Sequence, residues 1–151
     1  MIRRLSEIIR DLELDHGDLV IFGSGPLLAH RLRDKVGDLD VIARGETWNR
    51  VSERGNRAKG TINGARLVEF CGGRIQFSRG WISDDYDADE LIDRAEVFPI
   101  DQRKAHRELR FARLDEVLRY KKTLKRSKDR SDIRALARKL DRPQEGRQAH
   151  V

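Results

Sequence analysis

Asp38 and Asp40, two aspartates separated by one apolar residue, are the residues of this chain best suited to chemistry. Side chains alternate between the two faces of a strand, so a strand opened by Asp38-Leu39-Asp40 carries both carboxylates on one face, about 7 Å apart. Leu39 and Val41 then point the other way, into a core. Two carboxylates on one face suit a hard divalent cation, which takes oxygen ligands and bridges to phosphates.

A glycine turn precedes the aspartate pair. Gly23, Ser24 and Gly25 lie between an apolar strand predicted over 19–22 and a helix predicted over about 26–34. Glycines let backbone N–H groups approach a phosphate, and a helix start favours an anion. Ser24 could donate its hydroxyl to a phosphate oxygen or cap the helix. A solvated acidic pair and a lone Gly-x-Gly are each common, but the two together, in strand-turn-helix-strand order, favour a phosphate site.

Two familiar phosphate motifs do not fit this turn. Pro26 follows Gly25 where a P-loop has Lys-Ser/Thr, and Leu28 stands where a dinucleotide fingerprint has its third glycine. Instead, Gly23-Ser24, a helix and Asp38-Leu39-Asp40 resemble the signature of the nucleotidyltransferase superfamily of the DNA polymerase β type. This resemblance implies an α/β (α+β) fold, with a mixed sheet flanked by helices and a helical C-terminal part.

The resemblance also implies roles for these residues. Gly23 and Ser24 would contact the triphosphate of a nucleoside triphosphate such as ATP, and Asp38 and Asp40 would hold Mg²⁺ or Mn²⁺. The implied reaction transfers a nucleoside monophosphate to a hydroxyl acceptor, which is RNA, a protein or a small molecule.

A basic and acidic cluster near the C-terminus extends the resemblance. It is similar to a Lys…Arg-x-Lys-Asp-x-x-Asp-Ile pattern of small bacterial nucleotidyltransferases, which include relatives of abortive-infection toxins of toxin-antitoxin systems and of antibiotic-modifying enzymes. The matching residues are Lys121, Arg126, Lys128, Asp129, Asp132 and Ile133.

Within this cluster, the resemblance implies a catalytic role for Lys121 and a nucleotide-binding role for Lys128, where cations offset phosphate charge. The helical register of Lys121 puts it on an apolar face, where an unpaired ammonium is costly. In the alternative, Asp129 and Asp132 begin a helix and the basic residues are surface charges.

The third carboxylate of the superfamily has no obvious counterpart. Its matching place is Ile75-Gln76-Phe77, and Gln76 adds no negative charge. Glu69, on the adjacent predicted strand, is the nearby possible third ligand, or else a half-exposed strand residue. A third carboxylate commonly helps to activate the attacking hydroxyl. An alternative function is therefore a catalytically impaired nucleotide- or nucleic-acid-binding module, and a third is a basic structural or partner-binding protein that uses no nucleotide.

Length and composition limit the possible partners, domain organisation and location of the protein. The chain has 151 residues, and its 32 Lys and Arg against 26 Asp and Glu give a net charge of +6, which favours polyanions such as RNA. The length suits one domain, predicted over 1–141, with a flexible tail over 142–151. The single cysteine, Cys71, excludes an internal disulfide and indicates a cytoplasmic location. No apolar run is long enough for a membrane helix, and no histidine pair has zinc-ligand spacing.

The remaining pattern predicts the elements that position these residues. Trp48 and Trp81 could stack a base or anchor a core, and Trp81 is the better candidate for a pocket wall. Helices are predicted over 2–14, 46–54 and 89–94 and from 114 and about 129; strands over 65–70, 74–78 and 96–100; a hairpin turn over 71–73; and a polar, basic link over 57–60.

Overall fold

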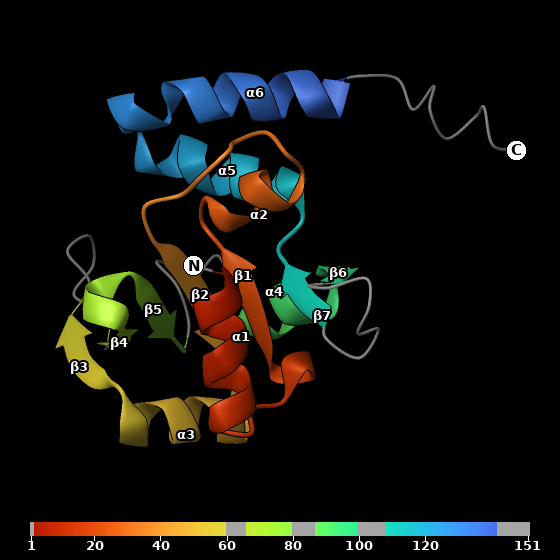
Figure 1. Ribbon diagram of the computed structural model, residues 1–151. Helices are drawn as coiled ribbons and strands as arrows, with labels where there is room; N and C mark the ends of the chain where they lie inside the picture. Colours follow the sequence, from red (N-terminus) through yellow and green to blue (C-terminus); the bar gives the residue numbers. More distant parts are fainter. Residues whose placement is uncertain (1, 60–65, 80–86, 100–107, 142–151) are drawn as a thin grey trace, which may run out of the picture.

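The computed structural model describes residues 2–59, 66–79, 87–99 and 108–141. Within these residues, seven strands form one mixed sheet in the order β3-β4-β5-β2-β1-β7-β6, and helices flank it (Figure 1). The strands are β1 (Leu19–Phe22), β2 (Leu39–Ala43), β3 (Asn56–Lys59), β4 (Arg66–Phe70), β5 (Ile75–Ser78), β6 (Glu96–Pro99) and β7 (Glu108–Phe111). The α-helices are α1 (Ile2–Asp11), α2 (Gly25–Ala29), α3 (Gly45–Arg54), α4 (Ala88–Asp93), α5 (Leu114–Leu124) and α6 (Arg130–Asp141). Short 3₁₀ helices are η1 (His16–Asp18), η2 (Cys71–Gly73) and η3 (Ser127–Asp129).

The centre of the sheet is buried on both faces. All four residues of β1 are buried, because Leu19 and Ile21 belong to one core and Val20 and Phe22 to the other. β1 pairs antiparallel with β2 and parallel with β7, and β2 pairs parallel with β5. A strand covered on both faces has a continuous apolar sequence, which is what the 19–22 run shows.

One face of the sheet is covered by α1 and α3. Leu5, Ile8 and Ile9 of α1 and Val51 of α3 pack with the side chains that β1, β2 and β5 direct to this face. The helical spacing of the apolar residues in 2–14 is therefore explained by this single buried stripe.

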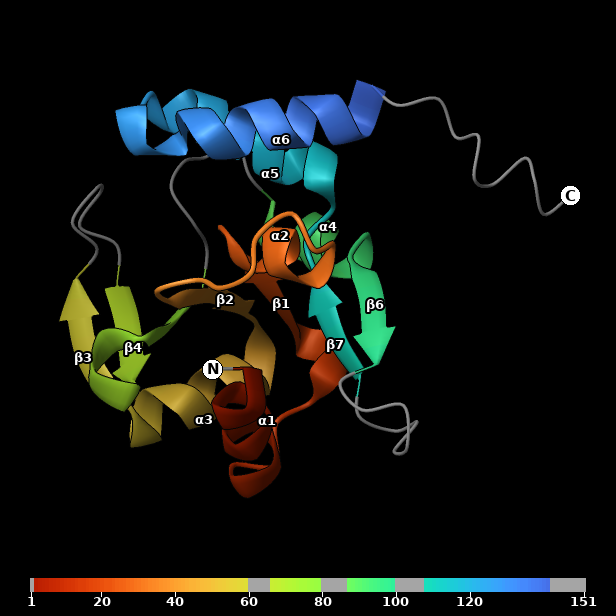
Figure 2. The same ribbon diagram turned by 45° about the horizontal axis from the view of Figure 1, so that its top comes forward.

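The other face is covered by α2, α4 and the C-terminal helical pair. Leu27, Ile92, Val117 and Leu136, one from each of α2, α4, α5 and α6, meet in the second core. Figure 2 shows α6 lying along α5, with α5 above α2. This packing brings the C-terminal part of the chain to the turn that follows β1.

The predicted α/β class, the mixed sheet and the helical C-terminal part are confirmed. The prediction of a polar, basic link over 57–60 is wrong, because residues 56–59 form the edge strand β3. Its side chains are mostly polar and exposed, so the sequence gives no sign that its backbone pairs with β4. The helix predicted over 26–34 ends at Ala29, because Arg31 adopts a left-handed φ of 59° without a glycine to indicate it. Strand β7 was not predicted. Trp81 and the tail over 142–151 lie outside the described residues.

None of the helices in the described ranges combines the length and the apolar character needed to cross a membrane.

Candidate functional site

The turn after β1 and the start of β2 lie against each other. In the antiparallel β1–β2 pair, Phe22 stands opposite Asp40, so Gly23 directly adjoins the Asp40 carboxylate. Gly23 has a φ of +66°, and a Cβ placed on it would lie 2.6 Å from Oδ2 of Asp40. Glycine is therefore favoured here both by its left-handed backbone conformation and by the close approach of the carboxylate.

Asp40 is a half-buried acid with a perturbed pKa. Burial, and secondarily the charge of Asp38, raise the pKa of Asp40 from 3.8 to about 7, against the lowering effect of Lys121, Arg126 and Lys128. Asp38 itself lies immediately before β2 and is exposed, whereas Leu39 and Val41 are buried in the core below. The predicted pair thus consists of one solvated and one desolvated carboxylate that interact with each other.

Lys121 is the buried cation of the site. It extends from α5, is 1% exposed, and donates a hydrogen bond from Nζ to Oγ of Ser24 at 3.0 Å. The same Nζ lies 3.3 Å from Oδ1 of Asp129 and 3.3 Å from Oδ2 of Asp132. Two carboxylates and a hydroxyl therefore offset the cost of removing this ammonium from water.

The chain reversal after α5 creates this contact. Lys125 ends α5 in the left-handed conformation with a φ of 52°, and η3 and α6 then run back along α5. The reversal brings Asp129 and Asp132 beneath Lys121, although they lie 8 and 11 residues later in the chain.

Asp129 links the buried Lys121 to Arg126, which lies nearer the surface of the site. Burial alone would raise its pKa, but the hydrogen bond from Arg126 and the charge of Lys121 outweigh burial and hold the pKa of Asp129 below its usual value. Arg126 binds it through two nitrogens, with Nε 2.7 Å from Oδ2 and Nη2 3.2 Å from Oδ1. Lys128 is exposed in η3, close enough to Asp40 to lower its pKa.

Gln76 occupies the place next to Asp40. In the parallel β2–β5 pair Asp40 stands opposite Gln76, which in turn stands opposite Glu69 on β4. The amide of Gln76 donates a hydrogen bond to Oε1 of Glu69 at 3.2 Å. Glu69 is thus one strand further from Asp40, about 10 Å away between backbones. Across the described ranges, no three His, Cys, Asp or Glu residues gather closely enough to hold a metal ion.

The structure brings together the predicted Gly23, Ser24, Asp40 and Lys121, with Asp38 at their edge and Lys128 on the same side. It does not bring Glu69 to Asp40. The role of Ser24 as a helix cap is not realised: its side chain makes no cap hydrogen bond and accepts one from Lys121 instead.

Three residues of the site were missing from the predicted set. Arg126, Asp129 and Asp132 were noted only as parts of the C-terminal pattern, and the helix-start alternative for the two aspartates concealed their contacts with Lys121. The signal was present in the sequence, because a lysine on an apolar helix face needs carboxylate partners.

Comparisons with protein-family models, with curated proteins and with solved structures give no match for this chain.

Proposed function

We propose that this protein is a nucleotidyltransferase that uses Mg²⁺ or Mn²⁺ to transfer a nucleoside monophosphate from a nucleoside triphosphate to a hydroxyl acceptor. One observation carries the proposal. At the adjoining ends of β1 and β2, the half-buried carboxylate of Asp40 lies against Gly23, and the next residue, Ser24, is held by the buried ammonium of Lys121.

The donor set fits a magnesium ion that takes part of its coordination from water and phosphate. Burial and Asp38 oppose ionisation of Asp40, and a divalent cation would relieve both effects by neutralising the two carboxylates. When bound, such an ion supplies positive charge to the phosphate oxygens of the reacting nucleotide. The two carboxylates, Asp38 and Asp40, are the residues that would hold it.

Gly23 and Ser24 are suited to receive the triphosphate. Because Oγ of Ser24 accepts a hydrogen bond from Lys121, its own proton is free to donate to a phosphate oxygen. Lys121 is therefore a positioning residue: it fixes the polarity of the Ser24 hydroxyl rather than contacting phosphate itself. Arg126 and Lys128 add positive potential near Asp40, which would stabilise the charge that develops on a pyrophosphate leaving group.

The proposed reaction needs no cofactor besides the metal ion. The acceptor oxygen forms a bond to the α-phosphorus, the bond from that phosphorus to the bridging oxygen of the β-phosphate breaks, and pyrophosphate leaves. The acceptor proton passes to water, because the amide of Gln76 cannot take it. RNA is the favoured acceptor, since the chain carries a net charge of +6.

Gln76 also favours a second candidate function. Without a third carboxylate, the same site would bind a metal-nucleotide complex and turn it over slowly or not at all. The chain would then act as a nucleotide-binding module.

The test is transfer of label from each of the four α-³²P-labelled triphosphates, with Mg²⁺ or Mn²⁺, to total RNA and to cell extract. Wild type is compared with Asp40→Asn and with Asp34→Asn, a matched loss of an exposed carboxylate. We expect label in one acceptor fraction with wild type and Asp34→Asn, and none with Asp40→Asn. Equal labelling by all three would refute the site.

Thermal stabilisation by metal-nucleotide separates the two candidate functions. Stabilisation of wild type that Asp40→Asn abolishes, without any labelling, supports the binding module. If wild type shows neither labelling nor stabilisation, both candidates are wrong.

A further inference from the structure

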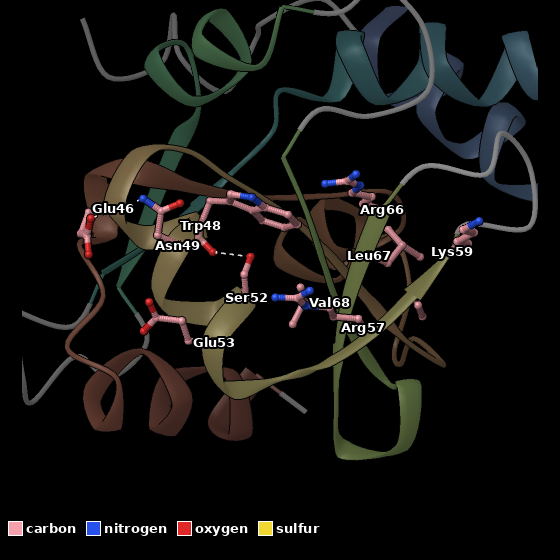
Figure 3. A pocket seen from close by; sticks show the side chains of 11 residues that line it. Glu46, Trp48, Asn49, Ser52, Glu53, Arg57, Lys59, Arg66, Leu67 and Val68 are labelled. Atoms are coloured by element: carbon pink, nitrogen blue, oxygen red, sulfur yellow. Dashed lines mark hydrogen bonds between the residues drawn. The ribbon is translucent and has the colours of Figure 1, made fainter.

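An open pocket lies on the sheet face opposite Asp40, between α3 and the β3–β4 hairpin (Figure 3). Its volume of about 810 Å³ falls within the usual range for ligand sites. Strand register places it on that face: Val68 of β4 belongs to the core under α1 and α3, whereas its neighbour Glu69 shares the row of Gln76 and Asp40. The pocket is therefore separate from the proposed nucleotide site.

One wall of the pocket is cationic. Lys59 of β3 stands directly opposite Arg66 of β4, and Arg57 lies on the same face one pair further along, opposite Val68. These three exposed residues, Arg57, Lys59 and Arg66, are called the cationic wall. Like charges directly opposite each other across two strands destabilise a sheet. Within the ranges that the structure describes, no hydrogen bond or ion pair joins the cationic wall to a carboxylate.

Trp48 forms the aromatic part of the pocket. Its side chain is half-buried, packs against the core on one side, and extends from α3 towards β4 (Figure 3). Its backbone carbonyl accepts a hydrogen bond from Oγ of Ser52 at 2.8 Å, one turn later in the helix. A partly exposed indole beside exposed cations is the combination that binds an unpaired nucleotide: the ring stacks on the base and the cations bind phosphates.

The α3 wall is polar and acidic. Glu46 and Glu53 lie across the pocket from the cationic wall, and Asn49 lies between them. Glu46 also accepts a hydrogen bond from Asn49 at 3.4 Å and lies 3.9 Å from Arg50. Carboxylates on this side repel a phosphate backbone and accept hydrogen bonds from base N–H groups, so they would orient a strand with its phosphates on β3–β4.

We propose that this pocket binds single-stranded nucleic acid, with phosphates on Arg57, Lys59 and Arg66 and a base stacked on Trp48. The proposal goes beyond nucleotidyl transfer and does not depend on it. Stacking uses a feature that every base shares, so we expect weak sequence preference.

Fluorescence anisotropy of a fluorescein-labelled oligouridine RNA tests the cationic wall, in EDTA and without any triphosphate. The variant R57A/K59A/R66A is compared with R130A/R134A/R138A, which removes three exposed arginines along α6 and so makes the same change in net charge. We expect the first to weaken binding at least about tenfold and to reduce the slope of log affinity against log salt by about 2. The second should have little effect. Equal losses would mean unspecific attraction by net charge and would overturn the proposal.

Trp48→Leu and Trp48→Phe test the stacking. We expect a loss on the order of tenfold for the aliphatic variant and a much smaller loss for the aromatic one, with folding of both checked by urea unfolding. In a Trp81→Phe variant, Trp48 is the only tryptophan and is not itself substituted. RNA should quench the fluorescence of this variant. An RNA duplex should bind more weakly than the single strand. Duplex binding as tight as single-strand binding, or unquenched fluorescence at saturation, would overturn the proposal while leaving the labelling experiment unaffected.

Discussion

Replacement of Asp40 by asparagine should stabilise the metal-free protein, by an amount that depends on pH. The pKa of Asp40 is raised from 3.8 to about 7, mainly by burial and then by Asp38. In the folded state its proton is therefore retained over a pH range in which the unfolded chain has already released it. Because the unfolded state binds fewer protons there, the free energy of unfolding falls as pH rises from about 4 to about 7, and is flat above.

The size of the effect follows from the two pKa values. A shift of about 3 units corresponds to about 4 kcal/mol of lost stability once pH exceeds 7. At pH 5 only part of this cost is present, about 1.5 kcal/mol, because the folded carboxyl is still protonated. Asparagine has nearly the same shape and no charge. The difference in unfolding free energy between Asp40→Asn and wild type should therefore grow by about 2 to 3 kcal/mol between pH 5 and pH 8.

Urea unfolding in EDTA at the two pH values measures this difference, with Asp34→Asn as the control. Asp34 is exposed on the connection between α2 and β2, so its variant should follow wild type at both pH values. Mg²⁺ added at pH 8 should then stabilise wild type and leave Asp40→Asn unchanged. If the difference in unfolding free energy between Asp40→Asn and wild type is the same at pH 5 and pH 8, the pKa of Asp40 is not raised by burial. The reason for placing a cation there would then be lost.

Two further substitutions test the rest of the site. Lys121→Ala leaves the carboxylates of Asp129 and Asp132 without their shared buried cation, so we expect the free energy of unfolding in urea to fall by about 3 kcal/mol and stabilisation by metal-nucleotide to be lost. The control Lys125→Ala removes an exposed lysine nearby and should change neither quantity. Equal, small effects of the two substitutions would mean that Lys121 acts only as a surface charge. Gln76→Glu adds a carboxylate beside Asp40 and removes the hydrogen bond to Glu69, so it should lower metal-free stability, recover it with Mg²⁺, and raise the rate of label transfer. Unchanged transfer by Gln76→Glu together with fast transfer by wild type would show that a third carboxylate is not limiting.

The sequence predicted best where local pattern and packing agree. The alternation of Leu39, Asp40 and Val41 and the amphipathic spacing of α1 are periodic patterns that match a strand and a helix, and the continuous apolar run of β1 matches a strand that is covered on both faces. It predicted poorly where backbone conformation overrides side-chain type. Edge strand β3 carries polar residues because side chains on both of its faces are largely exposed. Helix α2 ends at Ala29, two residues before a left-handed Arg31, and no glycine in the sequence indicates that turn.

The site was predictable in its parts but not in its connections. Ser24 and Lys121 were both candidates, yet nothing local shows that residues 97 positions apart share a hydrogen bond. That contact depends on the turn at Lys125, whose left-handed conformation has no sequence signal, and on α6 packing back along α5. Electrostatics that arise from packing, such as the pKa of Asp40, likewise follow from the folded chain and not from residue type.

The buried Lys121 joins the turn after β1 to the C-terminal helical pair. A buried ion cluster is a poor source of stability, because desolvation cancels most of its attraction, but removal of any one member leaves a charge uncompensated. Lys121 on α5, Asp129 in η3 and Asp132 on α6 must therefore be in place together, and only then does the ammonium reach Ser24. The orientation of the Ser24 hydroxyl next to Gly23 and Asp40 thus depends on docking of the C-terminal helical pair. The turn after β1, which we propose binds phosphate, is completed by residues from the last third of the protein, so the arrangement exists only when both parts are folded together.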